Sequence, residues 1–417
     1  MSFKVTKELA LDYHKNDKAG KIGVYTTKSF KNRDDLSLAY TPGVAYACEE
    51  IKSNPQDAFL YTTKRNLVAV ISNGTAVLGL GNIGALASKP VMEGKAVLFK
   101  EFAKVDSFDI EVDEDDIDRF CDVVKAISPT FGGINLEDIK APECFAIEER
   151  LIEELDIPVM HDDQHGTAII TSAALLNACE ILNKRVEDLK VVVVGAGAAA
   201  IACSKMYKEL GITNLIMCDS KGVLNETRDD LNQYKKEFIS DYETMEDAFR
   251  DADMVLGLSR PKTFTLKHIE LMCDEPIVFT LANPTPELFP DDVKSVKPKA
   301  ITATGRSDFA NQVNNVLGFP FIFRGALDVQ AMKITMSMKI AAAKAISNLA
   351  KEPITDEVRA IFGDLSFGKD YIIPTPFDKR LLIEVSSAVA LEAFNLGITR
   401  VKKFDVESYK KELENLK

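Results

Sequence analysis

The chain has 417 residues, of which 46% are hydrophobic and 28% charged, a balance typical of a globular protein. This length exceeds one ordinary core, so we expect two domains. A formal net charge of -13 and a pI near 5.0 argue against nucleic acid or an anionic membrane surface as a partner. An anionic small molecule would need local positive groups, such as a metal ion, a lysine or helix N-termini.

The cysteine pattern and the N-terminus indicate a compartment. The seven cysteines are scattered without a CxxC pair, which predicts free thiols in a reducing environment. The N-terminus lacks the apolar stretch of a signal peptide, and no window has the roughly 18 apolar residues of a membrane span. The sequence therefore predicts a cytoplasmic protein.

The first part of the chain, residues 1–160, is predicted to form a smaller α/β domain. Residues 67–72 and 76–80 have the pattern of two strands joined by a tight turn. A helix that carries Lys95 is expected to begin near Pro90, because proline is favoured at the first helical position.

The second part, residues 161–417, is predicted to form a Rossmann-like, doubly wound parallel sheet with C-terminal helices. The four valines at 191–194 are typical of a strand buried on both faces. Further strand patterns alternate with helical stretches, which predicts a parallel sheet; they lie at 214–219, 253–258, 277–282 and 300–305. Helical patterns dominate the end of the chain, at 328–351, 380–394 and 406–416.

Two glycine patterns compete as the dinucleotide-binding loop. Residues 79–84 match GxGxxG, and residues 195–200 match its GxGxxA variant. The second follows the valine strand and opens an alanine-rich helix, which is the context that the fingerprint requires. The predicted cofactor contacts in this loop are Gly195, Ala196, Gly197, Ala198 and Ala199.

The cofactor's ribose is predicted to lie near Asp219, at the end of the next strand. A carboxylate there accepts hydrogen bonds from an unphosphorylated ribose, which favours NAD. Lys221 could instead pair with the 2′-phosphate of NADP. These cues conflict, so both cofactors stay open, with Asp219 tipping the expectation towards NAD.

Two carboxylate pairs follow strand-like runs in the first part of the chain. Glu137-Asp138 and Asp162-Asp163 would converge if both strands end at the same edge of a sheet. Oxygen ligands point to Mg²⁺ or Mn²⁺ rather than to zinc. The neighbouring His161 and His165 lack the HExxH framing of a zinc site, so capping or core roles are favoured.

A lysine and a tyrosine complete the candidate chemistry. Taken alone, Lys95 is typical of a surface lysine and Tyr40 of a core tyrosine. A partly desolvated lysine beside a metal would have a lowered pKa and could act as a base. A tyrosine could then return a proton to a developing enolate.

With these residues side by side, the chain resembles the malic enzyme family in its short bacterial form. The resemblance runs from about residue 20 to residue 400. It rests on ordered blocks at 40–45 (YTPGVA), 77–84 (VLGLGNIG), 90–100, 134–139 (INLEDI), 161–168 (HDDQHGTA), 281–287 (LANPTPE), 304–309 (TGRSDF) and 311–328.

The resemblance implies oxidative decarboxylation of L-malate to pyruvate and CO2 with reduction of NAD or NADP. It implies that three carboxylates bind the divalent metal, namely Glu137, Asp138 and Asp163. Lys95 would be the general base with Asp162 as its charge partner, and Tyr40 the acid that protonates C3. Two amides would contact the substrate and the nicotinamide end of the cofactor, namely Asn283 and Asn314. The resemblance also implies a homodimer or a larger homo-oligomer.

Three residues depart from the pattern of the family: Asn73, Ala85 and Ala310 stand where we expect aspartate, proline and proline. The residue that binds the C4 carboxylate of the substrate is not apparent.

Two other functions are alternatives to malate decarboxylation. They are a metal-assisted hydroxy-acid dehydrogenase that stops at the keto acid and a nucleotide-binding regulator with a decayed site. The second would require a broken set of site residues.

Overall fold

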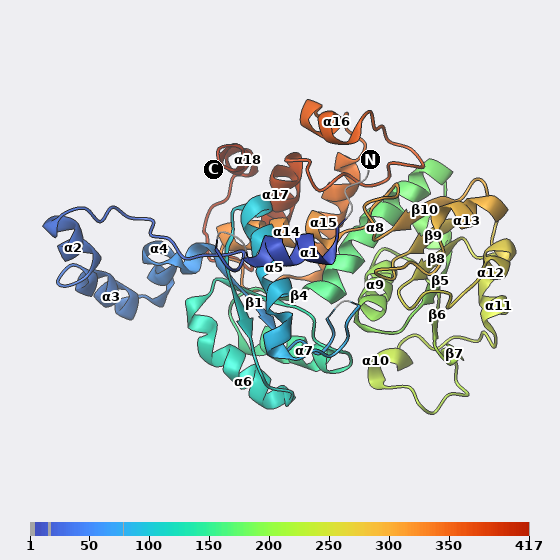
Figure 1. Ribbon diagram of the computed structural model, residues 1–417, viewed down its shortest axis with the longest axis horizontal. Coiled ribbons are helices and arrows are strands. Elements are labelled where there is room, and N and C mark those ends of the chain that lie inside the picture. Colours follow the sequence, from blue (N-terminus) through green and yellow to red (C-terminus); the bar gives the residue numbers. More distant parts are fainter. Residues whose placement is uncertain (1–4, 16–17, 78, 417) are drawn as a thin grey trace.

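The computed structural model describes residues 5–15, 18–77 and 79–416. Two sheets lie side by side, each covered by helices, and further helices lie between them (Figure 1). Strands and helices alternate along most of the chain, which confirms the predicted α/β class.

The first sheet has four parallel strands in the order β2-β1-β3-β4. Its strands are β1 (Leu67–Ser72), β2 (Asp106–Glu111), β3 (Gly133–Leu136) and β4 (Val159–His161). The helices that connect them are α5 (Ala85–Ala103), α6 (Ile117–Ile127) and α7 (Glu143–Glu154). Every residue of β1 and β3 is buried, because helices cover both faces of a parallel sheet.

The prediction of a strand at residues 76–80 is wrong. Val77 forms only an isolated bridge with Gly81, and Leu78 lies outside the described residues. Gly79 and Gly81 have φ angles of +72° and +74°, which place the segment in a tight turn rather than a strand. The next helix, α5, begins at Ala85, so Pro90 lies inside the helix rather than at its start.

The second sheet has six strands in the order β10-β9-β8-β5-β6-β7. Its strands are β5 (Lys190–Val194), β6 (Asn214–Asp219), β7 (Gly222–Val223), β8 (Met254–Gly257), β9 (Ile277–Thr280) and β10 (Ile301–Thr304). Its helices are α9 (Ala198–Glu209), α10 (Gln233–Lys236), α11 (Met245–Phe249), α12 (Leu266–Leu271) and α13 (Pro290–Val296). Only the short edge strand β7 is antiparallel. The chain winds outwards from β5 in both directions, as the Rossmann-like prediction requires.

A long helix, α8 (Asp162–Leu182), leads from the first sheet to the second. It is long and apolar enough to cross a membrane by composition, but 67% of its apolar window is buried. It packs against α9 and α15 (Met336–Leu349). Its apolar character is therefore that of a core helix.

Helices make up the C-terminal part of the chain, and one of them, α14 (Phe319–Asp328), returns to the helix α5 of the first sheet. The others are α15, α16 (Asp356–Phe362), α17 (Arg380–Asn395) and α18 (Val406–Glu414). Phe319 of α14 packs against Phe99 of α5 with ring centroids 4.8 Å apart. The single helix expected at 328–351 is in fact the end of α14 and a separate α15, whose N-terminus is capped by Thr335.

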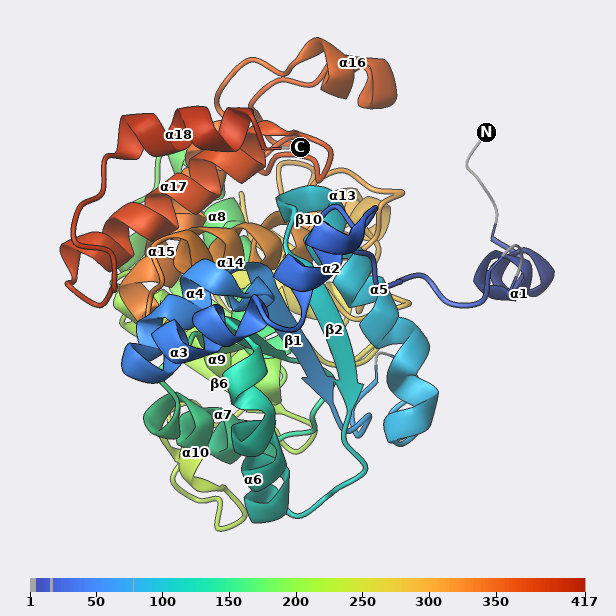
Figure 2. The ribbon, with the colours of Figure 1, turned by 90° about the vertical axis from the view of Figure 1, so that its left-hand side faces the viewer.

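The N-terminal helices lie apart from this body. They are α1 (Lys7–Lys15), α2 (Arg33–Ala39) and α3 (Val44–Ser53). The next helix, α4 (Ala58–Tyr61), joins the body through the buried Phe59. α2 and α3 form an arm that extends away from both sheets (Figure 1), and α1 stands off on its own in the second view (Figure 2). In the described ranges, α1, α2 and α3 contain no buried residue.

Candidate active site

The carboxyl ends of β3 and β4 bring the predicted carboxylates together. Leu136 of β3 pairs with His161 of β4 in parallel register, so the residues that follow them lie side by side. Loops at this edge are where folds with parallel sheets place their binding groups. Four carboxylates meet there: Glu137, Asp138, Asp162 and Asp163.

Three of these carboxylates form a cluster that can hold a metal ion, namely Glu137, Asp138 and Asp163. One oxygen from each lies within 4.8 Å of the other two. Glu137 and Asp138 are each 4% exposed, and no group among the described residues is hydrogen-bonded to Asp138 Oδ2. Buried carboxylate oxygens in this arrangement suit a hard divalent cation such as Mg²⁺ or Mn²⁺.

The protein neutralises this cluster incompletely. Burial raises the pKa of Glu137 well above its usual value, and Lys95 offsets this only in part. Burial, followed by the charge of Asp163, raises the pKa of Asp138 to about 8. The cluster therefore has a deficit of positive charge that a metal cation would fill.

Lys95 lies between this carboxylate cluster and Asp162. Its Nζ atom is 2.8 Å from Glu137 Oε1 and 2.7 Å from Asp162 Oδ2, and it lies 4.3 Å from the centroid of the Phe319 ring. Burial opposes its charge, but Asp162 and Glu137 outweigh burial and raise the pKa of Lys95 above its usual value. The lowering expected for Lys95 beside a metal ion stays a prediction, because the raised pKa reflects the carboxylates alone.

Asp162 is fully buried and held by residues that the sequence did not single out. Asn315 Nδ2 donates to Asp162 Oδ2 at 3.2 Å, and Thr167 Oγ1 donates to Asn315 Oδ1 at 3.2 Å. A Cβ atom at Gly166 would lie 2.1 Å from Asp162 Oδ1, so only glycine leaves room for this carboxylate. Asn315 is the neighbour of the predicted Asn314 in the sequence block 311–328, and two adjacent asparagines give no local signal of which side chain faces the site.

A second buried carboxylate, Glu148, holds the start of α8 in place. Glu148 of α7 accepts a hydrogen bond from the backbone N–H of His161 at 2.8 Å and lies 2.9 Å from His165 Nε2. Burial opposes ionisation of Glu148, but His165 and the buried Lys339 outweigh it and lower the pKa of Glu148 to about 2. His165 thus has the core role that we expected.

The predicted dinucleotide loop joins β5 to α9. Gly195 has a φ of +134°, and a Cβ atom there would lie 2.4 Å from the carbonyl oxygen of Leu258. A Cβ atom at Gly197 would meet no atom within 4 Å, so the space in front of α9 is open. Ala198 and Ala199 form the first turn of α9, whose free N–H groups suit a pyrophosphate. Ala196 lies between the two glycines.

Asp219 ends β6, next to this loop, and is not free. Both of its oxygens accept hydrogen bonds from Arg228, and Oδ2 also accepts one from Lys235 at 2.9 Å. The predicted residue Lys221 extends its side chain to Asp230 instead, at 2.7 Å. Neither Arg228 nor Lys235 was singled out from the sequence, because the chain folds back to bring them to Asp219.

The two predicted amides lie on loops at the carboxyl edge of the second sheet. Asn283 follows β9 and is exposed, and a Cβ atom at Gly305 would lie 2.8 Å from its Nδ2 atom. A Cβ atom at Gly79 would lie 3.6 Å from Pro284, so this loop meets the turn that follows β1. Asn314 accepts a hydrogen bond from the N–H of Val316 and caps a short 3-10 helix. The two sheets thus direct their carboxyl edges towards one region.

Tyr40 is not part of this cluster within one chain. It caps the C-terminus of α2 and is 68% exposed, on the arm that extends away from α5 and α8 (Figure 1). The expected grouping of Tyr40 with Lys95 is therefore wrong for a single chain in this conformation. Local sequence could not reveal this, because the two residues lie on separate elements.

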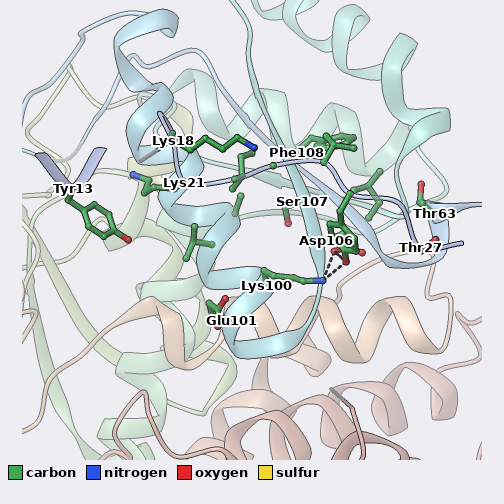
Figure 3. A pocket seen from close by; sticks show the side chains of 18 residues that line it. Tyr13, Lys18, Lys21, Thr27, Thr63, Lys100, Glu101, Asp106, Ser107 and Phe108 are labelled. Atoms are coloured by element: carbon green, nitrogen blue, oxygen red, sulfur yellow. Dashed lines mark hydrogen bonds and ion pairs between the residues drawn. The ribbon is translucent and has the colours of Figure 1, made fainter. Parts of the chain in front are cut away.

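A cavity of about 730 Å³ lies elsewhere, between the N-terminal segment, α5 and β2. It is lined by residues such as Lys21, Lys100 and Asp106, and Lys100 donates to Asp106 at 2.7 Å (Figure 3). Asp106 begins β2, so this cavity is at the amino edge of the sheet, opposite the carboxylates. Its position separates it from the candidate active site.

The three departures from the expected pattern lie around the site. Asn73 is buried and accepts a hydrogen bond from Thr75 Oγ1 at 2.7 Å. Ala85 is the first residue of α5, and Ala310 is exposed. Of the three, only Asn73 has a side-chain bond that orders a loop next to the carboxylates.

Comparisons with known proteins agree with this geometry. Residues 19–152 match the family model "Malic enzyme, N-terminal domain", and residues 164–367 match "Malic enzyme, NAD binding domain". The chain is 54% identical over 400 residues to an NADP-dependent malic enzyme from Halomonas elongata, covering 94% of this chain and 95% of the relative. A crystal structure of malic enzyme from Pyrococcus horikoshii has a TM-score of 0.91 and 44% identity, covering 98% of this chain and 95% of that one.

Another relative is longer. The chain is 54% identical over 417 residues to a probable NADP-dependent malic enzyme from Rickettsia prowazekii, covering 98% of this chain but 54% of the relative. The chain thus spans about half the length of this relative. Two family models that together span most of the chain, and a relative of matching length, lead to one conclusion. The chain belongs to the malic enzyme family.

Proposed function

We propose that the protein catalyses the oxidative decarboxylation of L-malate to pyruvate and CO2, with NAD⁺ or NADP⁺ as oxidant and Mg²⁺ or Mn²⁺ bound. The observation that carries the proposal is the position of Lys95, between Asp162 and the cluster of Glu137, Asp138 and Asp163. An amine beside carboxylates that could hold a cation supports the proposal, because deprotonation of a metal-bound hydroxyl needs both groups close together. The substrate is then a small anion that chelates the metal through a carboxylate and a hydroxyl.

Each residue has a distinct role in this proposal. When bound, the metal supplies Lewis acidity and the dinucleotide accepts the hydride from C2. Lys95 Nζ, in its neutral form, takes the proton of the C2 hydroxyl, and Asp162 stabilises the ammonium that results. The raised pKa of Lys95 is expected to fall when metal binding neutralises its carboxylate neighbours. Asn283 and Asn314 are proposed to orient the substrate and the nicotinamide.

Replacing Lys95 by alanine tests this proposal. We expect the rate of hydride transfer to fall by at least about 100-fold, because a positioned base accelerates a reaction by about 10²- to 10⁴-fold. Affinity for the dinucleotide should stay unchanged. Lys100→Ala is the matched control, since Lys100 lies on the same helix but pairs with Asp106 at the opposite edge of the sheet. Near-normal turnover of Lys95→Ala would exclude Lys95 as the base.

The product distinguishes decarboxylation from simple dehydrogenation. With malate and Mn²⁺, the expected products are pyruvate and CO2 in equal amounts with reduced dinucleotide. Oxaloacetate as the stable product would reject the proposed reaction. The intact set of lysine and carboxylates gives no support to a decayed regulator.

Tyr40 is proposed to act in a site of a second copy of the chain, within a homodimer. Its role is to donate a proton to C3 after CO2 has left. The arm that carries it bears large exposed apolar side chains, among them Leu38 at 74% and Tyr46 at 73% exposure. Such side chains on helices without buried residues suit contact with another subunit. A symmetric dimer would exchange the two arms.

Mixing two inactive variants tests this arrangement. If Tyr40 acts across the dimer, a hybrid of Tyr40→Phe and Lys95→Ala subunits has one complete site and one site with both defects. Random mixing should restore about a quarter of the wild-type activity, because half of the dimers are hybrid. If the arm closes on its own chain, both sites of the hybrid are defective and activity is not restored.

A further inference from the structure

The acceptor capacity of Asp219 is already filled. Its Oδ1 atom accepts hydrogen bonds from the backbone N–H of Lys221 at 2.9 Å and from Arg228 Nη1 at 2.7 Å. Its Oδ2 atom accepts from Arg228 Nη2 at 3.0 Å and from Lys235 Nζ at 2.9 Å. A carboxylate offers about four acceptor positions, so a ribose hydroxyl would have to displace one of these donors.

The surrounding cluster has a surplus of positive charge. Three cations, Lys221, Arg228 and Lys235, surround two carboxylates, Asp219 and Asp230. Arg228 also forms a bidentate interaction with Asp230, in which Nε donates to Oδ1 at 2.9 Å and Nη2 donates to Oδ2 at 2.9 Å. Among the described residues, the ammonium of Lys235 donates one hydrogen bond to a side chain, which leaves donors for a further group. The cluster therefore has one positive charge more than its own carboxylates neutralise, and this charge favours an anion.

The cluster lies where the adenosine ribose of a dinucleotide would lie. The backbone N–H of Gly195 donates to the carbonyl of Cys218 at 2.8 Å, which ties the glycine loop to the end of β6. In Rossmann-like folds the residue at the end of this strand faces the 2′ position of the ribose. A phosphate there would be the anion that the surplus charge accepts.

We propose that Arg228 and Lys235 recognise the 2′-phosphate of NADP and that Asp219 is a positioning residue that holds them, not an acceptor for the ribose. This proposal rests on the use of a nicotinamide dinucleotide in the proposed function. It reverses the expectation for NAD, because a carboxylate saturated by arginine and lysine no longer selects an unphosphorylated ribose. Lys221, more exposed than Arg228, provides additional charge at the rim.

Binding of two nucleotides that differ only in the 2′-phosphate tests the proposal directly. The probes are adenosine 2′,5′-bisphosphate and adenosine 5′-monophosphate, measured by isothermal titration calorimetry on the full chain without malate or metal. The wild-type protein should bind the bisphosphate more tightly. Arg228→Gln and Lys235→Gln should each weaken bisphosphate binding by about 10- to 100-fold, the range for a hydrogen bond between charged groups, and leave monophosphate binding unchanged.

Matched controls keep the outcomes distinct. Arg185→Gln removes an arginine that pairs with Glu187 at the opposite edge of the sheet and should change neither affinity. Lys235→Gln keeps the test valid if Arg228→Gln misfolds, because Lys235 is more exposed than Arg228 and its replacement disturbs the fold less. Equal affinities of the wild-type protein for both probes, or an equal loss of both in the two variants, would overturn the proposal. If the protein still distinguished the bisphosphate from the monophosphate but did not turn over malate, the proposed function would be contradicted and the assignment of the phosphate site would stand.

Discussion

Two groups of carboxylates follow parallel strands in this molecule, and their surroundings are opposite. Glu137 and Asp138 follow β3 and have too few positive neighbours, so burial raises their pKa values, that of Asp138 to about 8. Asp219 ends β6, where hydrogen bonds from Arg228 and Lys235 outweigh burial and lower its pKa to about 2. The same residue type at the same edge of two sheets thus fits a cation in one place and an anion in the other.

An acidic residue at a strand end therefore does not by itself define which ligand the site binds. Among the described residues, Lys95 is the single lysine that forms an ion pair with the first cluster, and it also pairs with Asp162. Three cations share two carboxylates in the second cluster. The balance of charge supplied by distant segments determines whether a site binds a metal or a phosphate.

The largest effect is expected for Glu137→Gln. The affinity for Mn²⁺, measured by calorimetry, should fall by more than about 100-fold, because even groups that only support a ligand contribute about 10- to 100-fold. The variant should also raise the melting temperature of the metal-free protein, since the raised pKa of Glu137 means that the fold disfavours its charge at neutral pH.

Glu153→Gln is the control, because Glu153 is an exposed glutamate on α7. A variant at Glu137 that binds Mn²⁺ normally would show that the carboxylate deficit does not serve a metal. The contrast between a cation-binding and an anion-binding cluster would then not hold for the first cluster.

A smaller effect is expected for Asn315→Ala. Asp162 would lose the amide at 3.2 Å that orients it, so Lys95 would keep its charge partner in a less defined position. We expect kcat to fall by about 10- to 100-fold with little change in metal affinity. Asn348→Ala, an exposed asparagine on α15, is the control. A fall in metal affinity equal to the fall in kcat would mean that Asn315 supports the metal cluster instead.

The smallest effect is expected for Asp219→Asn, as a change in the dependence of stability on pH. The pKa of Asp219 in the folded protein, about 2, is below the usual value of about 3.9. Its ion pairs therefore stabilise the fold above about pH 4, and that contribution is lost as the pH falls through the folded pKa. The stability difference between wild type and variant, from urea unfolding, should be constant near pH 6 and shrink between about pH 5 and pH 3. A difference that does not change with pH would show that the carboxylate gains nothing from Arg228 and Lys235.

Local patterns predicted much of the fold and part of the site. The valine run at 191–194 and the strands that follow it were placed correctly, because a strand buried on both faces needs a continuous apolar run. The strand at 76–80 was wrong because glycines with positive φ interrupt it. The division of the chain at residues 160 and 161 stays a prediction.

The sequence by itself determined the parallel strands of the second sheet, the glycine loop at Gly195, and carboxylates at the ends of two strands. These features depend on neighbours a few residues apart. Tertiary structure alone decided that Lys95 has a raised pKa, that Asn315 holds Asp162, and that Arg228 and Lys235 occupy Asp219. It also placed Tyr40 on an arm away from Lys95. Electrostatic and steric interactions act between groups close in space, and residues far apart in the chain become neighbours only when the sheets and helices have packed.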